Sequence, residues 1–152
     1  NTQLLMAYPF DKPVTDGLDK FDIPVVFVGE YLENSVLARA EWLKFFALFF
    51  NDEKEARFIF KGIEDKYQQV KKKTAGIKDS DKAPVFFGSF YQDTWFAPGG
   101  KSLMANLFMD AGANYIFSKN ATTKNIIVDN ELIVSKIPSI EFWGQVFAND
   151  KN

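Results

Sequence analysis

An alternation of short apolar segments with helical patterns most constrains the fold of this chain. Residues 3–8 and 25–28 are apolar enough to be buried strands, and residues 14–21 between them have the pattern of a short helix. Strand, helix and strand in so short a stretch are typical of a βαβ unit. Apolar residues run through both strands without polar alternation, so both faces of the sheet should be covered. The sequence therefore predicts an α/β fold with Rossmann-like parallel sheets.

Two helices should follow this unit. Residues 35–50 predict an apolar helix with Ser35 as its N-cap. Asn51 is the expected cap of a second helix, which keeps one apolar stripe at helical spacing and stops near Gly76. A helix of about 22 residues spans about 33 Å. Because that is long for a link back to a neighbouring strand, we expect a strut between two lobes.

The pattern divides the chain into three parts. Residues 1–50 would be the incomplete end of an N-terminal lobe, residues 51–76 a linker helix, and residues 77–152 a C-terminal lobe that is incomplete at its end. The polar stretch 76–82 marks the clearest boundary. Strands and helices should alternate again in the C-terminal lobe, in the order strand 84–88, helix 102–111, strand 115–117, helix 129–136 and strand 141–147.

The segment after strand 84–88 is unusually aromatic. We interpret it as a loop at the carboxyl end of that strand, which is where open α/β sheets bind ligands. Because the segment also contains Gln92, Asp93 and Thr94, we expect at least one of its aromatic rings to be exposed. Trp95 is the first candidate and should be more accessible than Trp42 or Trp143. The alternative is that these rings fill a core between loop and sheet. The predicted ligand-binding residues are Phe90, Tyr91, Trp95, Phe96, Gly99 and Gly100.

The run Gly99–Ser102 invites comparison with a phosphate-binding loop. That motif requires a glycine at the position that Trp95 occupies, so nucleotide binding is not expected. The glycines instead allow a tight turn into a helix whose first amides could meet an anionic group of a ligand.

Composition excludes several kinds of chemistry. The chain has no His and no Cys, which rules out the usual zinc ligands and the Ser-His-Asp and Cys-His nucleophiles. With 18 basic and 20 acidic residues, there is no positive excess for nucleic acid. We therefore predict no catalytic residue, no metal site and no cofactor, but a site that holds a ligand. No segment reaches the roughly 20 apolar residues of a membrane span. Because Asn1 opens on an apolar run without Met or a signal peptide, we expect a piece of a longer protein.

In the order of its elements and motifs, the chain resembles the later two-thirds of a class III periplasmic solute-binding protein, the component of ABC transporters that serves iron–siderophore, haem or cobalamin uptake. The resemblance is carried by Ile23–Val26, Leu37–Trp42, Lys54–Ala56 with Tyr67, Trp95–Ser102, Asp110–Gly112 and Asp129–Glu131.

The resemblance implies a function and partners. It implies a truncated two-lobe fold joined by one long helix, with a metal chelate bound in the cleft between the lobes and passed to a membrane permease. Glu131 matches the family's docking glutamate on the C-terminal lobe. The full-length protein would be periplasmic or on the cell surface, with a lipid anchor. An incomplete N-terminal lobe leaves Leu4, Leu5, Val25 and Val26 partly uncovered, so we expect this piece to self-associate.

Two other functions fit parts of the pattern. An α/β enzyme could use Glu30, Glu33 or Glu41 in acid–base chemistry on a small polar substrate. A sugar-binding module would also use aromatic platforms, but it would normally be all-β. A buried carboxyl group with a raised pKa would favour the enzyme.

Overall fold

The computed structural model describes residues 3–9 and 22–145, and the chain forms two compact units, Asn1–Glu33 and Asn34–Asn152. The first unit contains strands β1 (Leu5–Ala7) and β2 (Val25–Phe27), which pair in parallel with Leu5 opposite Val25. A short 3₁₀ helix, η2 (Glu30–Leu32), follows β2. Both predicted strands and their parallel pairing are confirmed. The helix expected at residues 14–21 lies outside the described residues.

The second unit begins with two helices that pack on each other, α1 (Val36–Ala47) and α2 (Glu53–Thr74). Ser35 is the N-cap of α1, as predicted, and its Oγ accepts a hydrogen bond from the amide of Ala38 at 3.4 Å. Asn51 was wrongly predicted as the cap of α2. It lies in the left-handed region at φ 55° and turns the chain, so Asp52 becomes the N-cap.

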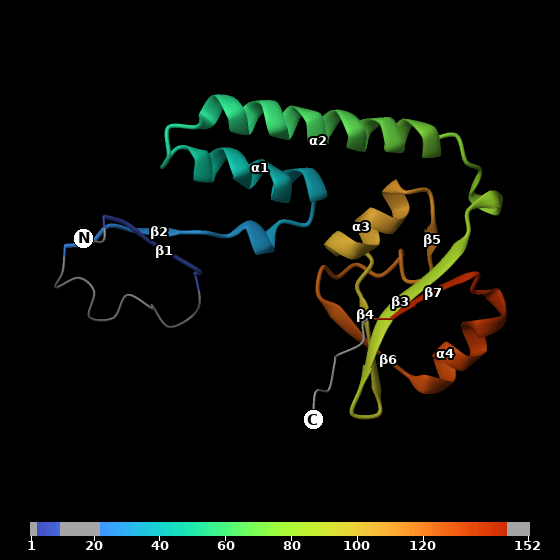
Figure 1. Cartoon of the computed structure of the whole chain (residues 1–152). Helices are drawn as coiled ribbons and strands as arrows, with labels where there is room; N and C mark the ends of the chain where they lie inside the picture. The colour runs from blue at the N-terminus through green and yellow to red at the C-terminus, as the bar shows by residue number, and fades with distance from the viewer. Residues whose placement is uncertain (1–2, 10–21, 146–152) are drawn as a thin grey trace. The chain divides into compact units, whose positions relative to one another are not determined.

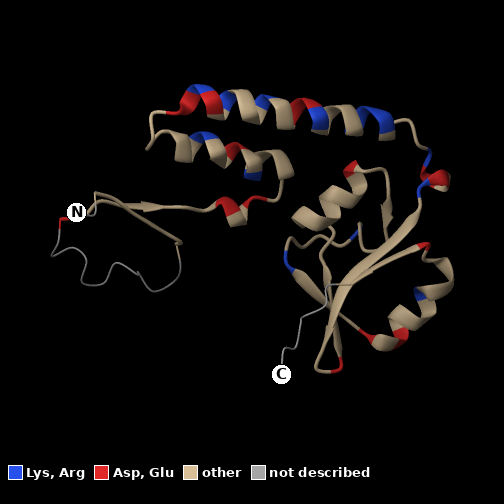
Figure 2. Cartoon of the chain, viewed as in Figure 1, with Lys and Arg blue, Asp and Glu red and all other residues tan. Residues whose placement is uncertain are grey.

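Charge is distributed differently on these two helices. Figure 2 shows Lys and Arg interspersed with Asp and Glu along α2, whereas the charged side chains of α1 are Arg39, Glu41 and Lys44. Acidic Glu53 and Glu55 lie in the first turn of α2 and three lysines lie in its last turn. These charges oppose the helix dipole and stabilise the helix, so α2 forms as the long element that the sequence predicts.

The sheet of the second unit has five strands, β3 (Pro84–Tyr91), β4 (Thr94–Pro98), β5 (Asn114–Tyr115), β6 (Asn125–Val128) and β7 (Phe142–Gln145). Their order is β5-β3-β4-β6, and β7 also pairs with β3. The pairs of β3 with β5 and β7 are parallel, as predicted, but β3–β4 and β4–β6 are antiparallel. Strands joined by a two-residue turn can only pair in this way, so the sheet is mixed.

Two helices cover opposite faces of this sheet, α3 (Leu103–Asp110) and α4 (Asn130–Lys136) (Figure 1). Phe86 is fully buried on one face and packs with Val128 and with Ile133 of α4. Its neighbour Phe87 points to the other face and lies 5.5 Å from Phe108 of α3. The alternation of side chains along β3 therefore supplies both apolar layers.

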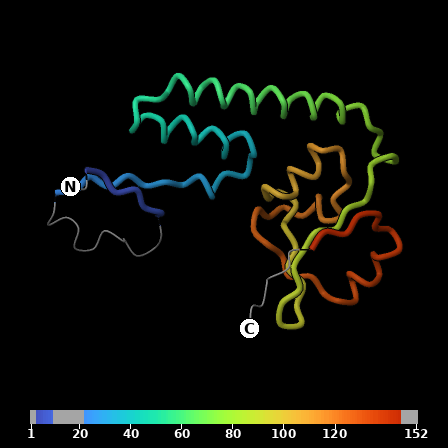
Figure 3. Tube along the Cα trace, in the orientation of Figure 1, coloured from blue at the N-terminus to red at the C-terminus, as the bar shows by residue number. Residues whose placement is uncertain are grey.

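The three-part division of the chain stays a prediction. The structure groups α1 with α2 and the sheet, because α1 contacts both α2 and α3. Figure 3 shows the β3–β4 hairpin extending away from α2.

Candidate functional site

The aromatic segment that follows Gly88 is not a loop, which corrects the interpretation from sequence. It forms the distal half of β3, a two-residue turn and β4, with Tyr91 opposite Thr94. The turn residues Gln92 and Asp93 have φ values of 46° and 57°. Two consecutive positive values are those of a type I′ turn, whose twist matches that of paired strands. The hairpin thus fixes the direction in which each aromatic side chain points.

The four predicted aromatic residues lie on two faces of the hairpin. Phe90 is opposite Trp95 in the register, and their rings are 5.1 Å apart. Tyr91 and Phe96 belong to the other face, because side chains alternate along each strand. The structure therefore pairs Phe90 with Trp95 on one face and leaves Tyr91 and Phe96 on the other, so the four rings do not form one platform.

Trp95 belongs partly to the core. Its ring lies 5.5 Å from Phe86 and 5.4 Å from Trp143, and it packs against the buried cluster of the second unit. Trp143 is 40% exposed, whereas Trp95 is half-buried. The prediction that Trp95 is more accessible than Trp143 is wrong, because the sheet neighbours of Trp95 cover it. The accessible rings of the hairpin are Phe90, 43% exposed, and Tyr91, 60% exposed.

Gly99 and Gly100 are buried beneath the loop formed by residues 117–124. The amide of Gly99 donates to the carbonyl of Lys124 at 3.0 Å. A Cβ atom on Gly99 would lie 2.4 Å from the carbonyl oxygen of Thr122, and one on Gly100 would lie 2.4 Å from that of Phe117. The two backbone segments approach so closely that no side chain fits at either position, which explains why both residues are glycine. Their predicted contact with a ligand stays a prediction.

The N-terminus of α3 has part of its amide capacity already satisfied. Ser102 is its N-cap and accepts from the amide of Ala105 at 3.2 Å, and the amide of Lys101 donates to the carbonyl of Thr122 at 3.0 Å. These bonds hold the turn against the neighbouring loop and reduce what the helix end offers to an anion.

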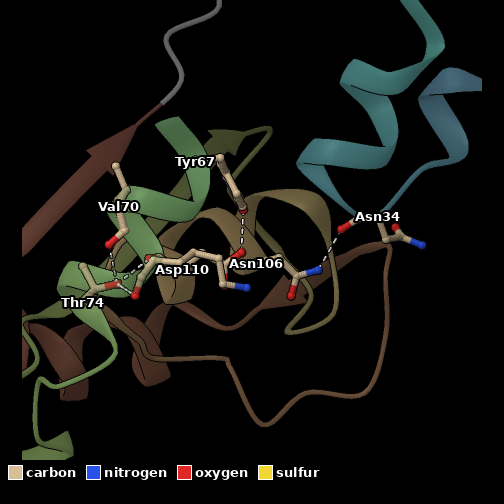
Figure 4. Close-up of polar contacts among 7 residues, drawn as sticks. Asn34, Tyr67, Val70, Thr74, Asn106 and Asp110 are labelled. Carbon is tan, nitrogen blue, oxygen red and sulfur yellow. Dashed lines mark hydrogen bonds and ion pairs between the residues drawn. The ribbon is translucent and has the colours of Figure 1, made fainter. Parts of the chain in front are cut away.

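A polar seam joins α2 to α3 and was missed from the sequence (Figure 4). The Tyr67 hydroxyl donates to Asp110 Oδ2 at 2.5 Å, and Lys71 Nζ lies 2.9 Å from Asp110 Oδ1. The Thr74 hydroxyl has three carbonyl acceptors in reach, of which that of Asp110 is closest at 2.8 Å. Burial, and after it the hydrogen bond to Asp110, raises the pKa of the Tyr67 phenol above its usual value.

The same seam explains two further residues. Gly112 ends α3 at φ 85°, and a Cβ atom there would lie 2.9 Å from the Thr74 side chain. Asn106 lies one turn before Asp110 and donates its side-chain amide to the carbonyl of Asn34 at 2.8 Å. One face of α3 therefore holds both α2 and the chain segment before α1.

Glu131 lies exposed in the first turn of α4. Its amide donates to Asp129 Oδ1 at 2.7 Å, so Asp129 is the cap and the Glu131 carboxylate is not needed for capping. Of the other carboxylates considered, Glu41 forms an ion pair with Lys44 on α1. Residues 3–9 and 22–145 contain no group of three His, Cys, Asp or Glu side chains that could hold a metal ion.

A family model described as periplasmic binding protein matches residues 9–151 of the sequence. This chain belongs to the periplasmic binding protein family. An uncharacterized lipoprotein from Methanocaldococcus jannaschii is 32% identical over 94% of the chain, which covers 34% of that relative. The chain therefore spans about a third of the length of this relative.

Solved structures of periplasmic binding proteins share the fold. The periplasmic haem-binding protein RhuT from Roseiflexus sp. RS-1 matches with a TM-score of 0.68 and 12% identity, over 88% of this chain and 50% of that one. The periplasmic vitamin B12 binding protein BtuF of Vibrio cholerae matches with a TM-score of 0.62 and 12% identity, over the same shares of the two chains. The predicted α/β fold class of these two-lobe proteins is thereby confirmed, and this chain spans about half the length of each of the two solved structures.

Among the described residues of this periplasmic binding protein, no helix is both long and apolar enough to cross a membrane. The matched family and the two solved structures are periplasmic binding proteins by description, and the ligand site of this chain stays a prediction. The Asp110–Gly112 motif was noted in the sequence only as part of the family resemblance. In the structure, Asp110 and Gly112 lie at the seam between α2 and α3.

Proposed function

We propose that this chain is part of the substrate-binding component of an ABC importer, which captures a metal chelate and delivers it to a membrane permease. Membership of the periplasmic binding protein family over residues 9–151 carries the proposal. The names of two relatives that share the fold, a haem-binding and a vitamin B12 binding protein, support a metal chelate as the ligand class. An iron–siderophore complex belongs to the same class.

The proposed ligand lies in the cleft between two lobes, with α2 as the linker helix. Phe90 and Tyr91 offer exposed aromatic surface at the end of the hairpin, which suits the apolar faces of a chelate. Binding here is an equilibrium step without catalysis. The full-length protein would act in the periplasm or at the cell surface and carry a lipid anchor, which the name of the archaeal lipoprotein supports.

The permease is the proposed protein partner, and Glu131 is its proposed contact. Exposure in the first turn of α4 leaves the carboxylate of Glu131 accessible to a basic side chain. An exposed charge pair of this kind steers association more than it adds to affinity. Self-association through the strands of the first unit remains a second prediction.

Tryptophan fluorescence of the full-length protein, titrated with a ferric hydroxamate siderophore, haemin and cyanocobalamin, tests the ligand class. We expect one of the three to bind, and Tyr91→Ala to weaken binding by about 1–3 kcal/mol, the scale of a lost aromatic contact. Phe58→Ala is the control, since Phe58 is an aromatic residue that is 74% exposed and belongs to α2 rather than to the hairpin. Absence of binding by all three chelates would contradict the proposal.

A further inference from the structure

A small polar pocket lies in the second unit, at the end of β3 that is opposite to the hairpin. Its volume is about 370 Å³, which is within the roughly 300–1,000 Å³ of pockets that hold small molecules. Asn114 lines it and is paired with Pro84, and these two residues begin the parallel strands β5 and β3. The pocket therefore lies at the amino-terminal edge of these strands. It is separate from the aromatic hairpin, which begins at the carboxyl end of β3.

Backbone hydrogen bonds hold the walls of this pocket in place. The amide of Asn114 donates to the carbonyl of Ala83 at 2.8 Å, and the amide of Ser118 donates to the carbonyl of Tyr115 at 2.9 Å. Tyr115 is itself fully buried, and its hydroxyl donates to the carbonyl of Pro98 at 2.5 Å. The fold thus forms the pocket before a ligand arrives, which lowers the entropy lost on binding.

Side chains that can donate hydrogen bonds are concentrated in the pocket. Asn114, Ser118 and Lys119 line it, and within residues 22–145 no hydrogen bond or ion pair engages their side chains. A carboxamide has two N–H donors, a hydroxyl has one and an ammonium has three. The turn after β5 therefore offers several donors that the protein itself does not use.

A second lysine adds positive charge from another segment. Lys82 precedes β3 and lines the same pocket, and its Nζ lies 2.7 Å from Asp79 Oδ1. The hydrogen bond from Lys82, and after it the Lys82 charge, lowers the pKa of Asp79, so this carboxylate stays ionised. One N–H of the Lys82 ammonium is used in this way and two remain. With Lys82 and Lys119 against Asp79, the lining residues carry an excess of positive charge.

We propose that this pocket binds a small organic anion, whose carboxylate or phosphate oxygens accept hydrogen bonds from Asn114, Ser118 and Lys119 and whose carbon atoms contact Met109 and Ala113. An anionic group supplies the acceptors that a set of free donors requires, and hydrogen bonds between charged partners are the strong ones. The positive excess favours an anion over a cation. Met109 and Ala113 add apolar surface, which suits an organic anion better than an inorganic one. The site goes beyond the proposed function and does not depend on the chelate.

Methyl NMR of the full-length protein, labelled at methionine, tests this site because Met109 lines the pocket. Butyrate and butyl phosphate carry the same carbon chain on two different anionic groups, and butanol carries it without charge. At constant ionic strength, we expect at least one of the two anions to shift the Met109 signal while Met6 of β1 stays unmoved. Butanol should leave both signals in place. The anion that binds more tightly identifies the preferred group.

A matched pair of lysine variants separates a built site from general attraction of anions. Lys119 is exposed, so Lys119→Gln should fold normally, and it should weaken binding of the preferred anion by at least about fivefold. Lys54→Gln removes the same charge from an exposed position on α2 and should change the affinity by less than about twofold, because distant exposed charges are screened. The proposal is overturned if neither anion shifts Met109 or if butanol shifts it equally. Equal weakening by the two variants would also overturn it.

Discussion

The seam between α2 and α3 depends on one acceptor, Asp110, and its removal should weaken the packing of α2 on α3. Asp110 is 27% exposed at the side chain and accepts from Tyr67 and Lys71. A hydrogen bond to a charged group contributes about 1.5–3 kcal/mol when well shielded. The ion pair with Lys71, whose side chain is 44% exposed, is worth about 0–1 kcal/mol. Asp110→Ala should therefore lower the free energy of unfolding by about 2–3 kcal/mol.

A double-mutant cycle isolates the Tyr67–Asp110 bond. We expect Tyr67→Phe alone to cost about 1–2 kcal/mol, and the pair to show a coupling energy of about 1–2 kcal/mol. Lys71→Met is the control and should cost less than about 1 kcal/mol. Urea unfolding of the full-length protein, followed by circular dichroism, measures all four variants. A coupling energy near zero, with Tyr67→Phe as stable as wild type, would refute the reasoning.

The same bond makes a prediction about pH. Burial and the Asp110 carboxylate raise the pKa of Tyr67, so the folded protein retains a phenol proton that the unfolded chain loses above about pH 10. The contribution is complete below that pH and is lost as pH rises through the raised value. The stability difference between wild type and Tyr67→Phe should therefore shrink above pH 10. A difference that is constant to pH 12 would show that the phenol is not perturbed.

Two further predictions follow from the glycines and from α4. Gly100→Ala should destabilise the fold by about 1–3 kcal/mol, because its Cβ atom meets three backbone carbonyl oxygens. Gly62→Ala, at an open position on α2, should instead stabilise it by about 0.5–1 kcal/mol in the same urea assay, and equal effects would contradict the packing described for Gly100. Glu131→Arg should leave ligand affinity intact and lower cellular uptake more than Asp129→Asn does. Normal uptake at matched expression would remove Glu131 from the docking surface.

Local sequence signals were sufficient for most helices and strands. The apolar periodicity of residues 53–74, with acidic residues at one end and lysines at the other, predicts α2 almost to its ends. Ser35 is a cap in both the prediction and the structure, because a serine before an apolar helical pattern satisfies a free amide within its own turn. Such features involve neighbours in the chain and therefore leave a readable pattern.

Turns without the usual residues were harder to predict. Gln92 and Asp93 form a type I′ turn although neither is the glycine or asparagine that such turns favour. For that reason the hairpin looked like a loop, and its aromatic residues looked like one surface. Strand β6 is only four residues long and was missed, and its pairing with β4 covers one side of Trp95.

The sequence by itself determined the class of this protein, because periodic burial and helix-end charges are local and strong enough to specify an α/β chain with one long helix. It also determined what chemistry is excluded, since a chain without His and Cys cannot build sites that require them. The tertiary structure alone decided which aromatic rings are accessible and why positions 99 and 100 have no room for a side chain. It also decided that Tyr67 binds Asp110, which is 43 residues away in the sequence. These features arise from contacts between distant segments, and a distance in space leaves no periodic signal in a single sequence.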